Sequence, residues 1–128
     1  VILASRRTAS DRRLWDEETL VASLQQELKN HLEVVSVDFA ALPATEQVRQ
    51  VAKSRVLAAV HGAGLTNMLF LPPEGGVLEI ALREGWFDLA GPQGSPKMYS
   101  DMAKRLGLAY IRWLYNDTLD SKGTINIS

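Results

Sequence analysis

The chain has 128 residues, of which 46% are hydrophobic, and a formal net charge of −1, which suits one domain with a sizeable core. This charge gives no field that would draw nucleic acid or an anionic membrane, and no apolar run reaches the roughly 18–20 residues of a membrane span. Cysteine is absent, which excludes disulfides, cysteine metal sites and thiol catalysis.

The first half of the chain alternates apolar strands with amphipathic helices. In chain order the pattern predicts a strand over residues 1–4, a solvated arginine-rich loop, a helix to about residue 30 capped by Asp16, a strand over residues 32–39, and a helix to about residue 54 capped by Thr45. The first residues do not form a signal peptide. Because the sequence opens inside a strand, we expect it to be a fragment of a longer protein.

The central stretch, residues 56–73, combines a strand, a glycine turn and a short helix. Its first five residues, Val-Leu-Ala-Ala-Val, have no polar alternation, which is typical of a strand buried on both faces of a parallel sheet. The sequence His-Gly-Ala-Gly follows at residues 61–64, and the next segment is stopped by two prolines at residues 72–73. Unpaired backbone N–H groups and the helix dipole converge at such a turn, which therefore predicts an anion site, here the diphosphate pocket of a nucleotide-binding domain.

The last third of the chain completes the alternation. After a turn at residues 74–76 the pattern predicts a strand over residues 77–82, an irregular loop over residues 83–94, a helix between Ser95 and Gly107, and a strand over residues 108–115. Strands alternating with helices imply a parallel sheet with right-handed crossovers. We therefore expect an α/β fold, a Rossmann-like three-layer sandwich with a five-stranded parallel sheet, over residues 1–115, followed by a polar tail or linker over residues 116–128.

Ligands of such sheets bind beyond the carboxyl ends of the strands, at the switch in strand order. The arginine loop, the glycine turn and the loop after the fourth strand all follow strands, so they are expected at that edge. The glycines have an alternative reading as a plain tight turn. Their pattern, Gly-x-Gly-x-x-Asn, lacks the third glycine of the dinucleotide fingerprint, which disfavours an oxidoreductase.

Several polar residues near this edge have both a functional and a structural reading. His61 is either a ligand or phosphate contact or a satisfied core histidine, and Thr66 and Asn67 either donate to phosphate or cap the helix. Glu79 interrupts an apolar strand, where a carboxylate is costly unless paired. It would either accept the ribose hydroxyls or form a buried pair with an arginine.

Three aromatic residues and the arginines complete the candidates. Trp86, Phe87 and Tyr99 could stack on a base, although core packing is the favoured reading for Tyr99. Arg6, Arg7, Arg12 and Arg13 would by default form a solvated loop. In a nucleotide site one or two of them would face the diphosphate, because arginine offers fixed bidentate donors.

The segments HGAGLTNMLFLPP and VLEIA resemble the signature of glycosyltransferase family 61. The Arg6-Arg7 and Arg12-Arg13 pairs, Glu46-Gln47, and the closing stretch from Tyr99 to Tyr110 also resemble the family, so the similarity covers most of the chain. The resemblance implies an inverting transferase that uses UDP-sugars and has two facing Rossmann-like domains, the GT-B arrangement. This chain would be the C-terminal, donor-binding half, and the acceptor side and the catalytic base would lie in an N-terminal domain absent from this sequence.

The candidate nucleotide-binding residues are Arg6, Arg12, His61, Gly62, Ala63, Gly64, Leu65, Thr66, Asn67 and Glu79, with no metal and no required cofactor. The expected partners are a UDP-sugar donor and a glycan or protein acceptor, with no nucleic acid and no membrane insertion. Two N-glycosylation triplets, at residues 116–118 and 126–128, favour a Golgi or endoplasmic reticulum lumen. The alternative is a non-catalytic scaffold module that keeps the transferase fold.

Overall fold

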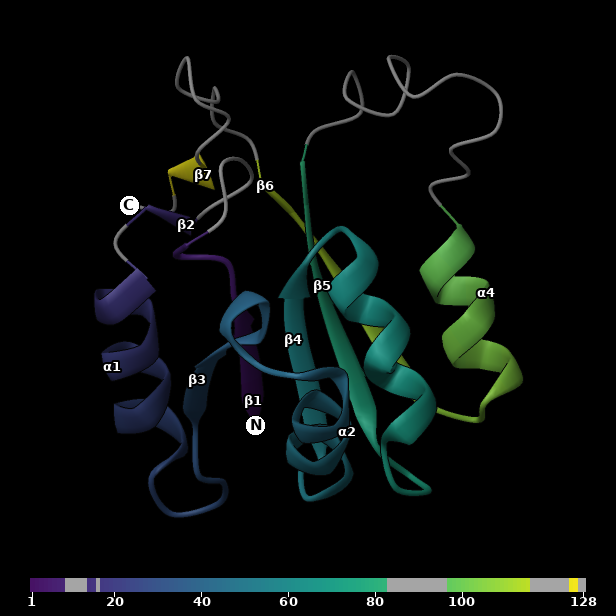
Figure 1. Ribbon diagram of the computed structural model, residues 1–128. Helices are drawn as coiled ribbons and strands as arrows, with labels where there is room; N and C mark the ends of the chain where they lie inside the picture. Colours follow the sequence, from purple (N-terminus) through teal and green to yellow (C-terminus); the bar gives the residue numbers. More distant parts are fainter. Residues whose placement is uncertain (9–13, 16, 83–96, 116–124, 127–128) are drawn as a thin grey trace.

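The computed structural model describes residues 1–8, 14–15, 17–82, 97–115 and 125–126 (Figure 1). Five strands form one sheet in the order β3-β1-β4-β5-β6, and every neighbouring pair is parallel. The strands are β1 (Ile2–Ser5), β3 (Val35–Asp38), β4 (Val56–Val60), β5 (Gly76–Leu82) and β6 (Ala109–Tyr115). The predicted α/β fold with a five-stranded parallel sheet is confirmed.

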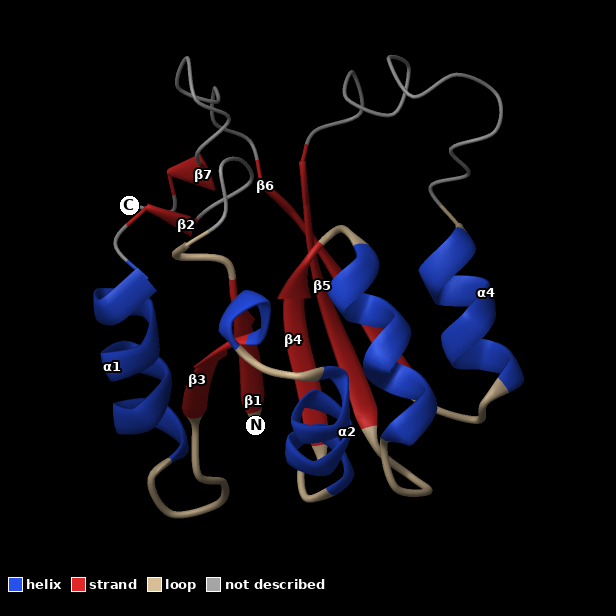
Figure 2. Cartoon of the chain, viewed as in Figure 1, coloured by secondary structure: helices blue, strands red, loops and turns tan. Residues whose placement is uncertain are grey.

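Helices cover both faces of this sheet and make the three layers of the sandwich (Figure 2). They are α1 (Glu17–Leu28), the 3-10 helix η1 (Phe39–Ala41), α2 (Ala44–Ala52), the 3-10 helix η2 (Ala63–Phe70) and α4 (Met98–Arg105). Side chains of α2, η2 and α4 pack on one face, and Leu20 and Val21 of α1 pack on the other. Among the described residues, no helix combines the length and the hydropathy that crossing a membrane requires.

Strand β4 is the centre of both cores. Leu57 and Ala59 belong to the cluster beneath α2, η2 and α4, whereas Ala58 and Val60 belong to the cluster beneath α1. All four side chains are at most 4% exposed. The prediction that this unbroken apolar run forms a strand buried on both faces is therefore confirmed.

The order of the strands creates a switch point between β1 and β4. The chain passes from β1 outward to β3, then returns across β1 and builds β4, β5 and β6 on the other side. Strand β1 pairs with β4 through Ile2 opposite Leu57 and Ala4 opposite Ala59. The helices after β1 and β4 consequently leave the sheet on opposite faces, which opens a crevice at the carboxyl ends of these two strands.

Element boundaries differ from the predictions in three places. The strand predicted over residues 32–39 begins at Val35, because the amides of His31 and Leu32 first close the end of α1 on the carbonyl of Leu28. Thr45 does not cap α2, which begins at Ala44 after Pro43. The helix after β4 is a 3-10 helix.

The end of α4 agrees with its prediction. Gly107 has φ of +69°, its amide bonds the carbonyl of Lys104 and the amide of Leu108 bonds that of Ala103, which is a glycine-terminated helix end. The predicted cap Asp16, the loop over residues 83–94 and the helix start at Ser95 lie outside the described residues.

The segment predicted as a polar tail contains one short strand. Strand β7 (Ile125–Asn126) pairs in parallel with β2 (Leu14–Trp15) to form a separate two-stranded sheet. Hydrogen bonding between backbone groups distant in the sequence needs no strong side-chain pattern, so neither segment was recognisable as a strand. The remainder of residues 116–128 lies outside the described residues, and the division at residue 115 stays a prediction.

Candidate functional site

A crevice of about 340 Å³ opens at the switch point between β1 and β4. Its volume is at the low end of the roughly 300–1,000 Å³ that is typical of ligand sites. Small apolar residues such as Ala4 and Ala59 line its base, and polar side chains line its walls. Those polar residues are Ser5, Arg6, Gln47, Thr66 and Asn67.

The glycine turn forms one wall of this crevice. Gly62 has φ of 154° and ψ of −176°, a combination that is essentially restricted to glycine, so the chain can leave β4 sharply here. The first hydrogen bond of η2 joins the amide of Leu65 to the carbonyl of Gly62 at 3.0 Å. The amides of Ala63 and Gly64 precede it and therefore have no acceptor within the helix.

Open space lies over Gly64. A Cβ atom built on this residue would meet no heavy atom within 4 Å, and both Ala63 and Gly64 line the crevice. An anion in the crevice could therefore come close to the backbone at the amino end of η2, where N–H groups and the helix dipole favour negative charge. The predicted roles of Gly62, Ala63 and Gly64 are compatible with this geometry and stay predictions.

Leu65, another of the candidate nucleotide-binding residues, packs in the core at the start of η2. Its side chain is fully buried in the core, and its amide already donates to the carbonyl of Gly62. A contact between Leu65 and a phosphate would require the first turn of η2 to open. The geometry therefore does not support Leu65 as a nucleotide contact.

Thr66 and Asn67 line the crevice, and their side chains also bond back to carbonyls of the first turn of η2. The hydroxyl of Thr66 donates to the carbonyl of Ala63 at 2.6 Å, and the amide nitrogen of Asn67 donates to the carbonyl of Gly64 at 3.2 Å. Neither contact is the predicted helix cap, in which a side-chain oxygen accepts from a backbone N–H; Gly62 holds the N-cap position of η2, and no side chain caps it. Donation from Thr66 to a phosphate would require its hydroxyl to release Ala63.

Gln47 is a crevice residue that was not among the candidates. Its side-chain amide donates to the carbonyls of Phe39 at 2.8 Å and Leu42 at 3.0 Å, and its oxygen lies 3.4 Å from the amide nitrogen of Asn67. It thereby links η1, α2 and η2 around the crevice. The signal that could have found it was the Glu46-Gln47 pair, because Gln47 faces the crevice whereas Glu46 pairs with Arg49 at the surface.

The arginine loop enters the crevice through Arg6. The loop is anchored by Ser5, whose hydroxyl donates to Glu17 at 2.9 Å and accepts from the amide of Arg7 at 3.2 Å. Arg12, the second arginine predicted to contact the diphosphate, lies outside the described residues. Arg6 therefore stands as the arginine candidate that the geometry supports.

The crevice lies where β4 borders β1, whereas the side chains of His61 and Glu79 meet where β4 borders β5. The Nδ1 atom of His61 bonds Oε1 of Glu79, and the His61 ring meets the ring of Tyr99 edge to face at 5.1 Å. Glu79 is fully buried, accepts from the hydroxyl of Tyr110, and lies 3.6 Å from Arg112. This burial fits the alternative, a buried carboxylate with an arginine, and a role of Glu79 in holding ribose hydroxyls stays a prediction.

The contacts in this buried cluster also bear on the predicted roles of His61 and Tyr99. The side chain of His61 points toward β5 and away from the β1 side, so the structural reading of His61 fits better than a phosphate contact. Tyr99 is 3% exposed, which confirms core packing rather than base stacking. Trp86 and Phe87, the other stacking candidates, lie outside the described residues.

The cluster shifts two ionisation equilibria. Burial acts to raise the pKa of Glu79, but hydrogen bonds from His61 and Tyr110 and the charge of Arg112 outweigh it, so the pKa lies below its usual value. Burial and the hydrogen bond and charge of Glu79 raise the pKa of Tyr110 to about 12. The carboxylate is therefore held ionised and the phenol protonated.

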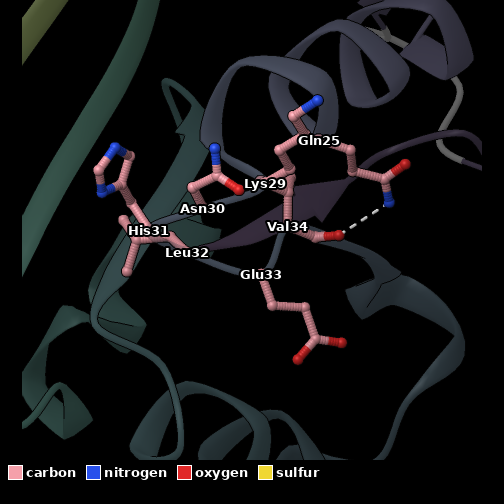
Figure 3. Close-up of a pocket in the computed structure, with 7 residues that line it drawn as sticks. All are labelled: Gln25, Lys29, Asn30, His31, Leu32, Glu33 and Val34. Carbon is pink, nitrogen blue, oxygen red and sulfur yellow. Dashed lines mark hydrogen bonds between the residues drawn. The ribbon is translucent and has the colours of Figure 1, made fainter.

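A larger hollow of about 520 Å³ lies at the opposite edge of the sheet, around the loop that joins α1 to β3 (Figure 3). Residues 29–34 and Gln25 line it, and the side-chain amide of Gln25 donates to the carbonyl of Val34 at 2.9 Å. Ligands of parallel α/β sheets bind beyond the carboxyl ends of the strands, so this edge is not the expected site. In the described part of the chain, no group of three His, Cys, Asp or Glu residues could hold a metal ion.

The family match and several similar proteins agree with the resemblance found in the motifs. The family Glycosyltransferase 61 matches residues 1–78. The EGF domain-specific O-linked N-acetylglucosamine transferases of Drosophila melanogaster and Gallus gallus are 33% and 30% identical over 113 and 107 residues. These alignments cover 88% and 84% of this chain but 19% and 18% of the relatives, so the chain spans about a fifth of their length. Because the family match covers more than half of the chain, the chain belongs to glycosyltransferase family 61.

Proposed function

We propose that this chain is the donor-binding half of an inverting glycosyltransferase that moves a sugar from a UDP-sugar to a hydroxyl group. One observation carries the proposal: a crevice at the switch point joins Arg6 to the open amino end of η2. A cationic side chain and backbone N–H groups that have no acceptor within their helix, both at one hollow, are what a diphosphate requires. The family membership supports the class of reaction.

The proposed mechanism uses these groups to stabilise the leaving diphosphate. The acceptor oxygen forms a new bond to the anomeric carbon, while the bond from that carbon to the β-phosphate oxygen breaks and its electron pair leaves with UDP. The acceptor proton passes to a base of the acceptor-binding domain that the family resemblance implies. Arg6 and the amides of Ala63 and Gly64 would bind the negative charge that UDP gains in the transition state, when such contacts are most useful.

The sugar and the acceptor are taken from the relatives as hypotheses. Their names state a transfer of N-acetylglucosamine to EGF domains. UDP-N-acetylglucosamine is therefore the first donor to test, and an EGF domain the first acceptor. A secretory location, in the Golgi or endoplasmic reticulum lumen, would agree with such an acceptor.

The alternative is a scaffold module that keeps the fold without turnover. The alignments cover about a fifth of the length of the relatives, so they do not by themselves assign the activity of a whole transferase to this chain. Both hypotheses predict a folded domain. They differ in whether the crevice binds a nucleotide.

Calorimetric titration of the chain with UDP distinguishes the two. We expect saturable binding that Arg6→Ala weakens, because a hydrogen bond to a charged group contributes about 1.5–3 kcal/mol. Arg105→Ala is the matched control, since Arg105 is an exposed arginine in the last turn of α4 and does not line the crevice. A folded chain that binds no UDP at millimolar concentration, or that loses equal affinity in both variants, would contradict the donor site.

A further inference from the structure

The buried cluster around Glu79 has no part in the chemistry described above. It lies next to the end of β4, where the chain enters the glycine turn, and on the face of the sheet where Tyr99 of α4 packs against His61. Glu79 is the only buried carboxylate among the described residues, with none of its surface exposed. Such a group is costly to bury, so its partners and their consequence for the fold need an explanation.

The partners of Glu79 converge on His61. The side chain of His61 bonds the Glu79 carboxylate, and its backbone N–H donates to the carbonyl of Ile80 at 2.9 Å. Both contacts are to neighbouring residues of β5. The last residue before the turn is therefore attached to β5 by its main chain and by its side chain.

The residue attached in this way controls where the turn begins. Gly62 follows directly, in a conformation restricted to glycine, and η2 starts one residue later with the bond from Leu65 to Gly62. A small rotation at residue 61 would therefore redirect the amides of Ala63 and Gly64. Such amides bind an anion well only when they are held in place beforehand.

We propose that Glu79 is a positioning residue, which acts through His61 to hold the Gly62–Gly64 turn in the orientation that binds the donor diphosphate. The proposal rests on the proposed function in that it takes UDP as the ligand of the turn. Glu79 itself does not contact the nucleotide. Tyr110 and Arg112 serve to hold the carboxylate ionised and in place.

The chemistry of the cluster makes Glu79→Gln an informative change. A carboxylate accepts hydrogen bonds at both oxygens, one from His61 and one from Tyr110. An amide of the same shape has only one oxygen, so one of the two partners must become an acceptor. The change removes the negative charge to which both partners donate, so it weakens the attachment of His61 without leaving a cavity.

A second pair of variants tests the same bond from the other side. Asparagine places its amide nitrogen as many bonds from Cα as Nδ1 of histidine, so His61→Asn retains a donor to Glu79. Leucine has the same branched shape without a donor. The comparison of His61→Asn with His61→Leu therefore isolates the hydrogen bond and remains usable if Glu79→Gln does not fold.

Two measurements report the result. Hydrogen exchange at the amide of Leu65 reports whether the turn remains closed on Gly62, without any ligand, and UDP titration reports the effect on binding. Leu108→Ala is the control for general destabilisation, because Leu108 packs against the same core before β6 begins. Amides within β4 serve as the internal reference for exchange.

We expect His61→Leu and Glu79→Gln to speed exchange at Leu65 relative to β4 and to weaken UDP binding about ten-fold, the lower end of what losing a supporting contact costs at metal sites. His61→Asn should stay close to the wild type. Unchanged exchange at Leu65 in both disruptive variants, or losses that merely follow those of Leu108→Ala, would overturn the proposal. If hydrogen exchange responds as expected but neither the wild type nor any variant binds UDP, the proposed function is rejected, whereas the role of Glu79 in positioning the turn is retained.

Discussion

The replacement of Gly64 by valine is the sharpest test of where the diphosphate binds. Gly64 lines the crevice, and a Cβ atom there would meet no heavy atom within 4 Å. The protein therefore has room for the valine side chain, but that side chain would occupy the space that a ligand in the crevice needs. We expect Gly64→Val to abolish UDP binding while the fold remains intact.

The magnitudes follow from the geometry. Helix propensities differ by up to about 1 kcal/mol between glycine and other residues, so the free energy of unfolding should change by less than about 1 kcal/mol. The branched side chain would keep a phosphate from the amides of Ala63 and Gly64. Two hydrogen bonds to a charged group are worth at least about 3 kcal/mol, so UDP affinity should fall by about 100-fold or more.

Gly75 provides the opposite case. A Cβ atom there would lie 3.0 Å from the carbonyl oxygens of Arg55 and Pro72, at the amino edge of the sheet and away from the crevice. Gly75→Ala should therefore destabilise the fold by about 1–3 kcal/mol through overpacking and leave UDP affinity unchanged.

The assay pairs calorimetric UDP titration with urea denaturation on the wild type, Gly64→Ala, Gly64→Val and Gly75→Ala. Affinity should fall with side-chain size at residue 64 and not with stability. Full UDP affinity in Gly64→Val would place the diphosphate elsewhere. Losses of affinity that follow the losses of stability across all variants would show that the effect is not local to the crevice.

The remaining predictions concern the buried cluster and the core. The pKa of Tyr110 is raised to about 12, so the free energy of unfolding should fall as the pH rises from about 10 toward 12, and Tyr110→Phe should remove this slope. Burial opposes the lowering of the pKa of Glu79, but the net shift is downward from 4.5, so its contribution to stability should be present above pH 4.5 and lost as the pH falls below it. An acid slope that Glu79→Gln leaves unaltered would contradict this account. Leu57→Ala, at the fully buried centre of the sheet, should cost about 2–5 kcal/mol in urea denaturation, whereas Leu69→Ala, at a side chain that is 55% exposed, should change little.

The alternation of elements was predictable because it depends on local patterns. The apolar run of β4, the prolines after η2 and the glycine after α4 each restrict the backbone of their own neighbours, so they are readable without knowledge of the fold. The same holds for the glycine turn, where the chain required a conformation that other residues avoid. The family signature also lies in this continuous segment.

The partners of the buried carboxylate could not be read in this way. Glu79 was correctly singled out as a costly charge in an apolar strand, and an arginine partner was one of its two readings. That the arginine is Arg112 depends on the register of β5 against β6, in which Glu79 and Arg112 are opposite one another. The contact with Tyr110 has the same origin, since it joins residues 31 positions apart.

The sequence by itself determined the class of fold, the position of the glycine turn and the family, because each rests on residues that are adjacent along the chain. Only the tertiary structure decided whether each side chain lies at the edge of β4 that faces β1 or at the edge that faces β5. Pairing of β4 with β1 on one edge and β5 on the other brings Arg6 to the open amino end of η2 and directs His61 to Glu79. The separation of the crevice from the buried cluster therefore depends on strand order, which side-chain patterns along a single strand do not encode.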